Sequence, residues 1–296
     1  MAMVKRVAFL GLGVMGYPMA GWLAKNGHAV VVYNRTEAVA EHWCRDYTSG
    51  ESAVTPRLAV KDADIVISCV GNDDDMRDIM LGDQGVLSDP LCGLKVGAII
   101  VDHTTTSAEL AKELAEVAAE KHFGFVDAPV SGGQQGAETG QLTIMCGGLQ
   151  EHFDVASVVM QGYAKSLQLM GDVGSGQLCK MVNQICIAGI IQGLAEGLNF
   201  AKRAGLDAQQ VVEVISKGAA QSWQMDNRHQ TMLADQYEHG FAVQWMRKDL
   251  AFALQEAEAN GSDLPIAKLV DSYYAEIQTM GGDRWDTSSL LARLER

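Results

Sequence analysis

The chain has 296 residues, enough for one large domain or two ordinary ones, and 48% of them are hydrophobic while 20% are charged. These fractions are typical of a globular protein with a substantial core. The net charge of −14 argues against a nucleic-acid partner, whose phosphates would need a broad basic face, but leaves room for a local basic pocket that binds a small anion.

The cysteines and the apolar runs indicate the redox state of the compartment and whether the chain spans a membrane. The six cysteines form neither a CxxC pair nor a zinc-like spacing, so we expect free thiols in a reducing, cytoplasmic compartment: Cys44, Cys69, Cys92, Cys146, Cys179 and Cys186. The N-terminus lacks a signal-peptide pattern, and no uninterrupted apolar run reaches about 18 residues, so no membrane span is expected. The GxxxG repeat of Gly189, Gly193 and Gly197 is interpreted as close helix packing in a soluble core.

A glycine-rich loop follows the first predicted strand, 4–10, and precedes a predicted helix, 15–26, and a second strand, 28–33. A GxGxxG inside such a βαβ unit of about 30 residues predicts a dinucleotide-binding site. The first glycine permits the tight turn, the second lets the backbone approach a pyrophosphate, and the third lets the helix pack closely. The helix N-terminus supplies N–H groups for the phosphates. The predicted cofactor contacts here are Gly11, Leu12, Gly13, Val14, Met15 and Gly16.

The end of the second strand selects the cofactor. Asn34, Arg35 and Thr36 stand where an NAD-binding chain would carry a carboxylate for the ribose 2′-hydroxyl. Arginine pairs with a 2′-phosphate through its planar fork, so we favour NADP, with NAD as the alternative if Arg35 only stacks on the adenine. Glu37 is expected to belong to the next helix.

Strands continue to alternate with helices, at 63–70, 98–102, 123–128, 142–146 and 166–170. This order predicts a Rossmann-type α/β domain with a doubly wound, mostly parallel sheet. Ligands bind beyond the carboxyl ends of such strands, where Val70 and the polar segments 71–75, 103–107 and 129–136 lie. Ser131 with the N–H groups of Gly132 and Gly133 could hold a carboxylate, although an ordinary loop is the alternative.

From residue 176 onward the pattern is helical, with predicted helices at 176–205, 208–217, 223–234, 241–260 and 265–280. The glycine-rich segment 171–176 is the predicted boundary between an α/β domain, 1–173, and an all-α domain, 174–296, built on one long helix. A cleft between two such domains is a common substrate site. Lys180, Asn183 and Gln184 share one face of the long helix, which indicates a reaction site; a solvated first turn is the alternative.

Two later segments are ambiguous from the residues alone. Arg247, Lys248 and Asp249 fit a surface ion-pair turn as well as a site. The segment 285–288 fits a capping turn before the last helix.

Together these segments resemble the β-hydroxyacid dehydrogenase family, also called the 3-hydroxyisobutyrate dehydrogenase family, over essentially the whole chain. Its motifs occur in order: FLGLGVMGYPMA at 9–20, the Ser/Thr-rich turn at 103–107, DAPVSGG at 127–133, GQLCKMVNQ at 176–184 and RKDL at 247–250. Trp22 departs from the asparagine that many members carry, which we interpret as a packing variation.

The resemblance implies a role for each matched residue. Lys180 would be the catalytic acid/base with Asn183 beside the substrate. Further implied contacts are Ser131, Gly132 and Gly133 with the substrate carboxylate, Thr105 and Lys248 with the nicotinamide half of the cofactor, and Phe241 and Asp249 with the substrate cleft. It also implies NADPH preference and a homodimer or homotetramer.

We therefore expect an oxidoreductase that transfers a hydride between NADP(H) and a small β- or γ-hydroxy acid or semialdehyde. Burial of Lys180 is expected to lower its pKa and make it a better base. An imine reductase or a non-catalytic NADP-binding protein of the same fold is the alternative, disfavoured because the lysine and its asparagine are present. The sequence leaves the particular hydroxy acid open.

Overall fold

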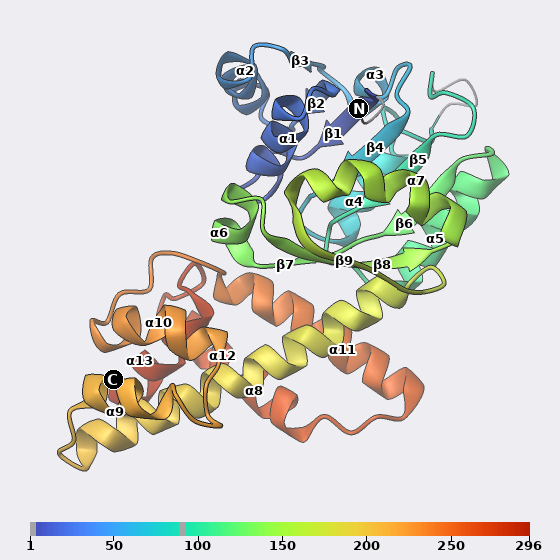
Figure 1. Cartoon of the computed structure of the whole chain (residues 1–296). Helices are drawn as coiled ribbons and strands as arrows, with labels where there is room; N and C mark the ends of the chain where they lie inside the picture. Colours follow the sequence, from blue (N-terminus) through green and yellow to red (C-terminus); the bar gives the residue numbers. More distant parts are fainter. Residues whose placement is uncertain (1–3, 89–92) are drawn as a thin grey trace. The chain divides into compact units, whose positions relative to one another are not determined.

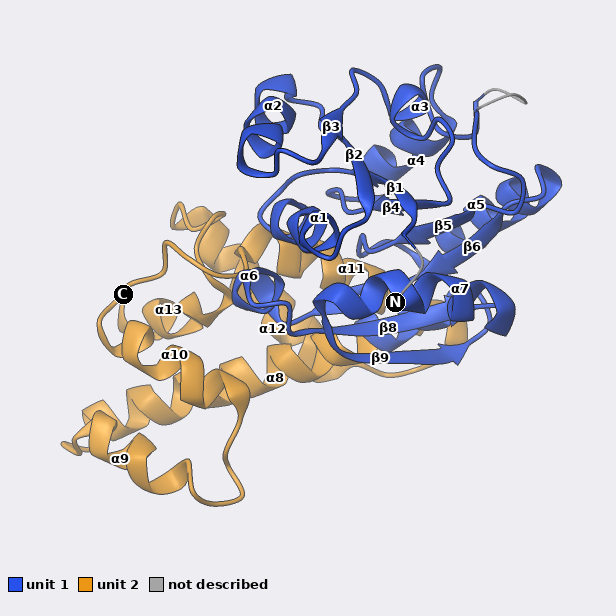
Figure 2. Cartoon of the chain, turned by 45° about the horizontal axis from the view of Figure 1, so that its top comes forward, with its two compact units in different colours: residues 1–180 blue, residues 181–296 orange. Residues whose placement is uncertain are grey.

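The computed structural model describes residues 4–88 and 93–296. The chain forms two compact units, residues 1–180 and 181–296, coloured separately in Figure 2. The division falls inside helix α8 (Ser175–Arg203), whereas the predicted boundary at 173/174 coincides with the beginning of that helix. Cys92 lies outside the described residues, and the other five cysteines are free thiols.

The first unit is built on a nine-stranded sheet in the order β3-β2-β1-β4-β5-β6-β8-β7, with β9 paired to β8 (Figure 1). Strands β1 to β6 run parallel to one another, β8 runs antiparallel to β6 and β7, and β9 is parallel to β8. The strands are β1 Arg6–Leu10, β2 Ala29–Tyr33, β3 Glu51–Ser52, β4 Ile65–Ser68, β5 Ile99–Asp102, β6 Gly124–Asp127, β7 Val130–Ser131, β8 Leu142–Gly148 and β9 Ala164–Gly171.

Helices cover both faces of this sheet, because alternate residues of each strand point to opposite sides. Phe9 and Ile67 belong to one core cluster with residues of α1, α7 and η1, while Ala8 and Val66 belong to a second cluster with residues of α3, α4 and α5. The helices are α1 Gly16–Lys25, α2 Glu37–Asp46, α3 Pro56–Ala59, α4 Asp73–Leu81, α5 Ala108–Glu120, α6 Gly133–Glu138, α7 Gln150–Met160 and η1 Gln161–Tyr163.

The second unit is helical and packs around the later turns of α8. Ala188, Ile191, Ala195 and Leu198 recur at helical spacing and are buried in its core. The other elements are α9 Ala208–Ile215, α10 Trp223–Leu233, α11 Val243–Asn260, α12 Pro265–Thr279, η2 Thr287–Ser289 and α13 Leu290–Glu295.

The predicted fold class is confirmed: a mostly parallel Rossmann-type sheet precedes an all-α unit with one long helix. The prediction missed the two-residue strands β3 and β7 and the short helix α6, since segments of two to six residues carry no readable period. It was also wrong about two of the three GxxxG glycines. Gly193 and Gly197 are exposed, and a Cβ on either would meet no described atom within 4 Å.

In the described part of the chain, α8 is the one helix long and apolar enough to cross a membrane by length and composition. A core helix of a soluble protein passes the same test, and polar side chains such as Lys180 and Gln184 are buried along this one. We therefore keep the interpretation of α8 as a core helix.

Candidate functional site

The glycine loop between β1 and α1 has the geometry that its sequence predicts. Gly11 has φ +99°, and a Cβ there would collide with the carbonyl oxygen of Cys69, which directly follows β4. A Cβ on Gly16 would lie 3.0 Å from the Phe9 ring, so this glycine lets α1 pack closely on β1. Gly13 faces open space within 4 Å among the described atoms, which leaves its backbone accessible to a phosphate group.

The loop is held from the end of β2. The Asn34 side chain accepts a hydrogen bond from Leu12 N at 2.9 Å and donates one to Thr36 O at 3.1 Å. The Arg35 side chain is 84% exposed and pairs with Asp75 at 3.0 Å. An exposed ion pair of this kind contributes little and breaks easily, so the guanidinium is accessible to an incoming anion.

The turn after β5 contacts the neighbouring strand end. Thr104 Oγ1 accepts a hydrogen bond from Val70 N at 3.0 Å, which ties two of the predicted cofactor segments together. Thr105 lies between the buried residues Thr104 and Thr106 and is itself half-buried. The structure thus brings the glycine loop, the β4 end and the Thr105 turn to one edge of the sheet.

Two ionisable side chains at this edge are structural. His103 is buried, and burial lowers its pKa to about 4, so the ring is neutral at physiological pH. Because the carbonyl of Ala128 can only accept, Nδ1 donates to it at 2.6 Å and Nε2 accepts from the Tyr163 hydroxyl at 2.8 Å. Both ring nitrogens are used, so His103 is not available as a general base.

Asp102 is the second of these groups. It is fully buried, and burial raises its pKa to about 7. The negative charge of the nearby Asp127 raises this pKa further, whereas hydrogen bonds from Thr104 and Ser68 lower it. Its Oδ1 accepts from Thr104 N at 2.9 Å and from Ser68 Oγ at 3.0 Å. Its Oδ2 is buried without a hydrogen-bond partner among the described residues.

Lys180 lies on α8 beside the segment that contains Ser131, Gly132 and Gly133. The lysine side chain is buried, and its Nζ donates a hydrogen bond to Val130 O at 2.9 Å. Gly132 and Gly133 have φ +130° and +60°, a backbone region that favours glycine. The predicted acid/base and the predicted carboxylate-binding segment are therefore neighbours within the first unit.

In the second unit, Asn183, Lys248 and Asp249 form one chain of polar contacts through Gln184. Asn183 Nδ2 donates to Gln184 Oε1 at 2.7 Å, and Gln184 Nε2 donates to Asp249 Oδ2 at 2.7 Å. Lys248 Nζ lies 3.3 Å from Asp249 Oδ1. Asp249 is buried, so the alternative of a plain surface turn is wrong for this residue. Gln184, which shares a helix face with Lys180, is the link.

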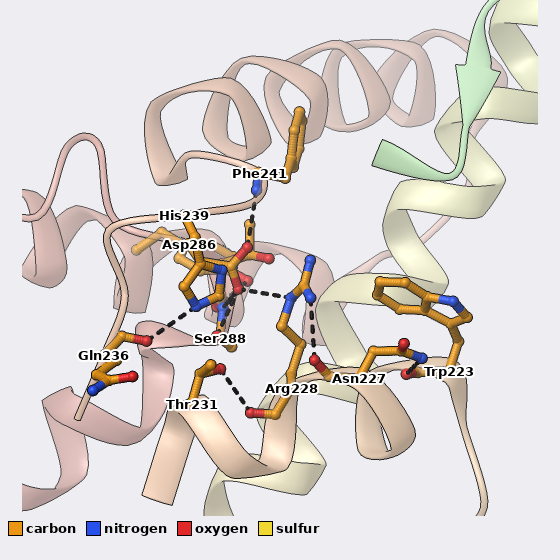
Figure 3. A network of polar contacts seen from close by, with 11 residues as sticks. Trp223, Asn227, Arg228, Thr231, Gln236, His239, Phe241, Asp286 and Ser288 are labelled. Carbon is orange, nitrogen blue, oxygen red and sulfur yellow. Dashed lines mark hydrogen bonds and ion pairs between the residues drawn. The ribbon is translucent and has the colours of Figure 1, made fainter. Parts of the chain in front are cut away.

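Phe241 lies outside this chain, in the loop before α11 rather than in the predicted helix 241–260. Its backbone N–H donates to the buried Asp286 at 2.9 Å, as Figure 3 shows. The same carboxylate accepts from Ser288 Oγ at 2.6 Å and pairs with Arg228 at 3.3 Å. Asp286 does cap the turn at 287–289, as predicted, but it also fixes the loop that carries Phe241. Sequence reasoning missed this second role because Phe241 and Arg228 are both distant from Asp286 in the chain.

The residues at the sheet edge fit a dinucleotide. The open backbone at Gly13 suits a pyrophosphate, and the exposed Arg35 suits a further phosphate. Described residues include no group of three or more His, Cys, Asp or Glu that could hold a metal ion. A parallel sheet with this loop, joined to a helical unit by a helix that carries a buried lysine, defines the class of NAD(P)-binding oxidoreductases.

Comparisons with known proteins give the family. Residues 6–171 match the NAD-binding domain of 6-phosphogluconate dehydrogenase, and residues 174–294 match the family described as "NAD-binding of NADP-dependent 3-hydroxyisobutyrate dehydrogenase". The chain belongs to the β-hydroxyacid dehydrogenase family, as its motifs predicted.

Individual relatives cover nearly all of the chain. An uncharacterized oxidoreductase of Shewanella frigidimarina is 60% identical, over 98% of each chain. The 2-hydroxy-3-oxopropionate reductase of Escherichia coli is 32% identical over 98% of this chain and 97% of its own. The structure of Mycobacterium tuberculosis 3-hydroxyisobutyrate dehydrogenase with L-serine superposes with a TM-score of 0.87 at 27% identity, over 99% of this chain and all of the other.

Proposed function

We propose that this protein is an NADP-dependent reductase of a small acid semialdehyde, acting reversibly on the corresponding β- or γ-hydroxy acid, with Lys180 as the acid/base. One observation carries the proposal: Nζ of the buried Lys180 lies 2.9 Å from Val130 O, in the segment that continues into Ser131 and Gly132. A proton donor next to a carboxylate-binding segment suits a substrate with an acid group and a carbonyl a short distance apart.

The bound nicotinamide would supply or accept the hydride. Lys180 as ammonium would donate its proton to the oxygen of the reduced carbonyl, and neutral Lys180 would take the hydroxyl proton in the reverse direction. The hydroxyl of Ser131 and the N–H groups of Gly132 and Gly133 would bind the substrate carboxylate. The family resemblance assigns substrate contacts to Asn183 and Asp249, and Gln184 would hold these two side chains in a fixed arrangement.

The preference for NADP rests on Arg35. Its side chain is 84% exposed and its partner Asp75 can be displaced, so the guanidinium can bind a 2′-phosphate with two parallel hydrogen bonds. The carboxamide of Asn34 is used by Leu12 N, and it carries no charge that would repel such a phosphate.

Initial rates with NADPH and with NADH on succinic, methylmalonate and tartronate semialdehydes and on glyoxylate test the proposal. Lys180→Ala should lower turnover on the preferred substrate by roughly 10²- to 10⁴-fold and leave NADP⁺ affinity unchanged. Lys202→Ala is the matched control, because Lys202 lies on the same helix and pairs with Glu295 on the surface. Equal turnover of Lys180→Ala and wild type, or no turnover of any substrate by wild type, would refute the assignment.

We further propose that α8 lies at an interface between copies of the chain. Its outer face presents apolar and small residues at helical spacing: Val182, Cys186, Ile190, Gly193, Gly197 and Phe200. Phe200 is 71% exposed, and fewer than half of the residues in the apolar stretch of this helix are buried within one chain. A second copy of the same face would cover them, as closed dimers with two-fold symmetry do.

A further inference from the structure

Gln177, in the first turn of α8, contacts the backbone of the turn that follows β5. Its side chain is fully buried. Oε1 accepts a hydrogen bond from Thr106 N at 3.1 Å, and Nε2 donates one to Thr104 O at 2.8 Å. The amide therefore bonds to both residues that flank Thr105, a task for which a side chain needs one acceptor and one donor.

Asp127, the last residue of β6, fixes the same turn of the helix. Its Oδ1 accepts from Gly174 N at 2.8 Å and its Oδ2 accepts from Gln177 N at 2.9 Å, which satisfies N–H groups that a helix N-terminus leaves unpaired. A Cβ on Gly176 would lie 2.7 Å from the backbone and side-chain oxygens of Asp127, so glycine permits this close approach. The beginning of α8 is thus bonded directly to a strand end.

Lys180 follows Gln177 by three residues and lies on the next turn of the helix. Because both residues belong to one rigid helix, a shift of the first turn would move Lys180 relative to Val130 and to the Thr105 turn. Displacements of about 1 Å at a reacting group can lower rates by roughly 10²-fold.

We propose that Gln177 is a positioning residue for the proton transfer by Lys180, an inference that rests on the proposed function. Its amide keeps the Thr105 turn, expected to contact the nicotinamide half of the cofactor, in a fixed relation to the helix turn that carries the lysine. Asp127 anchors that helix turn to the sheet. Gln177 acts through geometry and contacts neither substrate nor cofactor.

Gln177→Met tests this role, since methionine has a similar length and makes neither hydrogen bond. Gln192→Met is the matched control, because Gln192 is also buried on α8 and its amide donates to Glu196 of the same helix, at 2.6 Å, rather than to the turn at 103–107. Three quantities are measured: amide hydrogen exchange in the peptide 103–107, the single-turnover rate of NADPH oxidation, and the dissociation constant of NADP⁺.

In Gln177→Met we expect faster exchange in 103–107, a single-turnover rate lowered roughly 10- to 100-fold, and a far smaller change in NADP⁺ affinity. The control should match wild type in all three. In a Lys180→Ala background, Gln177→Met should cost little further rate, because the group that it positions is already gone.

A Gln177→Met rate within about threefold of wild type, unchanged exchange in 103–107, or an undiminished loss in the Lys180→Ala background would overturn the proposal. If Gln177→Met does not fold, the same measurements on Gln177→Glu test the proposal. Glutamate retains the acceptor for Thr106 N but, when ionised, cannot donate to Thr104 O, so a wild-type rate would overturn the proposal too. Inactivity of wild type on every semialdehyde would instead refute the proposed function. The exchange measurement would still test whether the hydrogen bonds of Gln177 stabilise the turn at 103–107.

Discussion

The buried carboxyl of Asp102 should make the protein less stable as the pH rises, and Asp102→Asn should remove that loss. The pKa of Asp102 is raised by burial from 3.8 to about 7, so between these values the folded state binds more protons than the unfolded state. Unfolding free energy therefore falls with rising pH across this window. An uncharged asparagine has no such dependence. The raised pKa of Asp102 lowers the unfolding free energy by roughly 4 kcal/mol at pH 8, compared with roughly 2 kcal/mol at pH 5.5.

Asparagine is a suitable replacement because its Oδ1 can accept the same hydrogen bonds from Thr104 N and Ser68 Oγ. The difference in unfolding free energy between Asp102→Asn and wild type should thus increase by roughly 2 kcal/mol from pH 5.5 to pH 8. For a unit of this size that is a relative gain in Tm of about 4–8 °C. Urea and thermal unfolding at three pH values measure it.

Asp83→Asn is the control, since Asp83 is an exposed carboxyl of the same unit. Any constant cost of placing an amide at position 102 cancels in the comparison between pH values. Parallel pH dependences of stability for Asp102→Asn and wild type would refute the reasoning.

Arg35→Ala should raise the dissociation constant of NADPH by roughly 10- to 100-fold and leave that of NADH nearly unchanged, because a charge-assisted contact to one phosphate is lost. Asp75→Ala should not weaken NADPH binding, since it only frees Arg35 from its ion pair; equal losses for both cofactors in Arg35→Ala would contradict the assignment. Phe200→Glu should lower the molar mass measured by light scattering after size exclusion, because a charge would enter an apolar interface. Val214→Glu, at an exposed valine of α9, is its control, and an unchanged mass in Phe200→Glu would exclude α8 from the interface.

The fold was readable from the sequence because the parallel strands β1, β2, β4, β5 and β6 are mostly apolar, and each of them is followed by or ends on a glycine or a polar residue. The GxGxxG prediction depended only on local order, and Gly11 and Gly16 have the close neighbours that it requires. The pairing of Asp102 with Asp127 was not readable, since it depends on β5 and β6 being adjacent and in register. The contact of Arg228 with Asp286 depends in the same way on packing between α10 and the turn before α13.

The polar residues at the strand ends divide into two groups that the sequence does not separate. Asn34 and Thr104, which follow β2 and β5, direct their side chains to backbone groups of neighbouring loops, as does Gln177 in the first turn of α8, so these residues fix the shape of the sheet edge. Buried backbone N–H and C=O groups need partners, and loops that approach one another at a ligand-binding edge offer few from regular structure. A prediction that every polar residue at a strand end contacts the ligand therefore includes residues that only stabilise neighbouring loops. Arg35 belongs to the second group, because its guanidinium is exposed and its ion pair with Asp75 is easily displaced, which is consistent with its proposed contact with a phosphate.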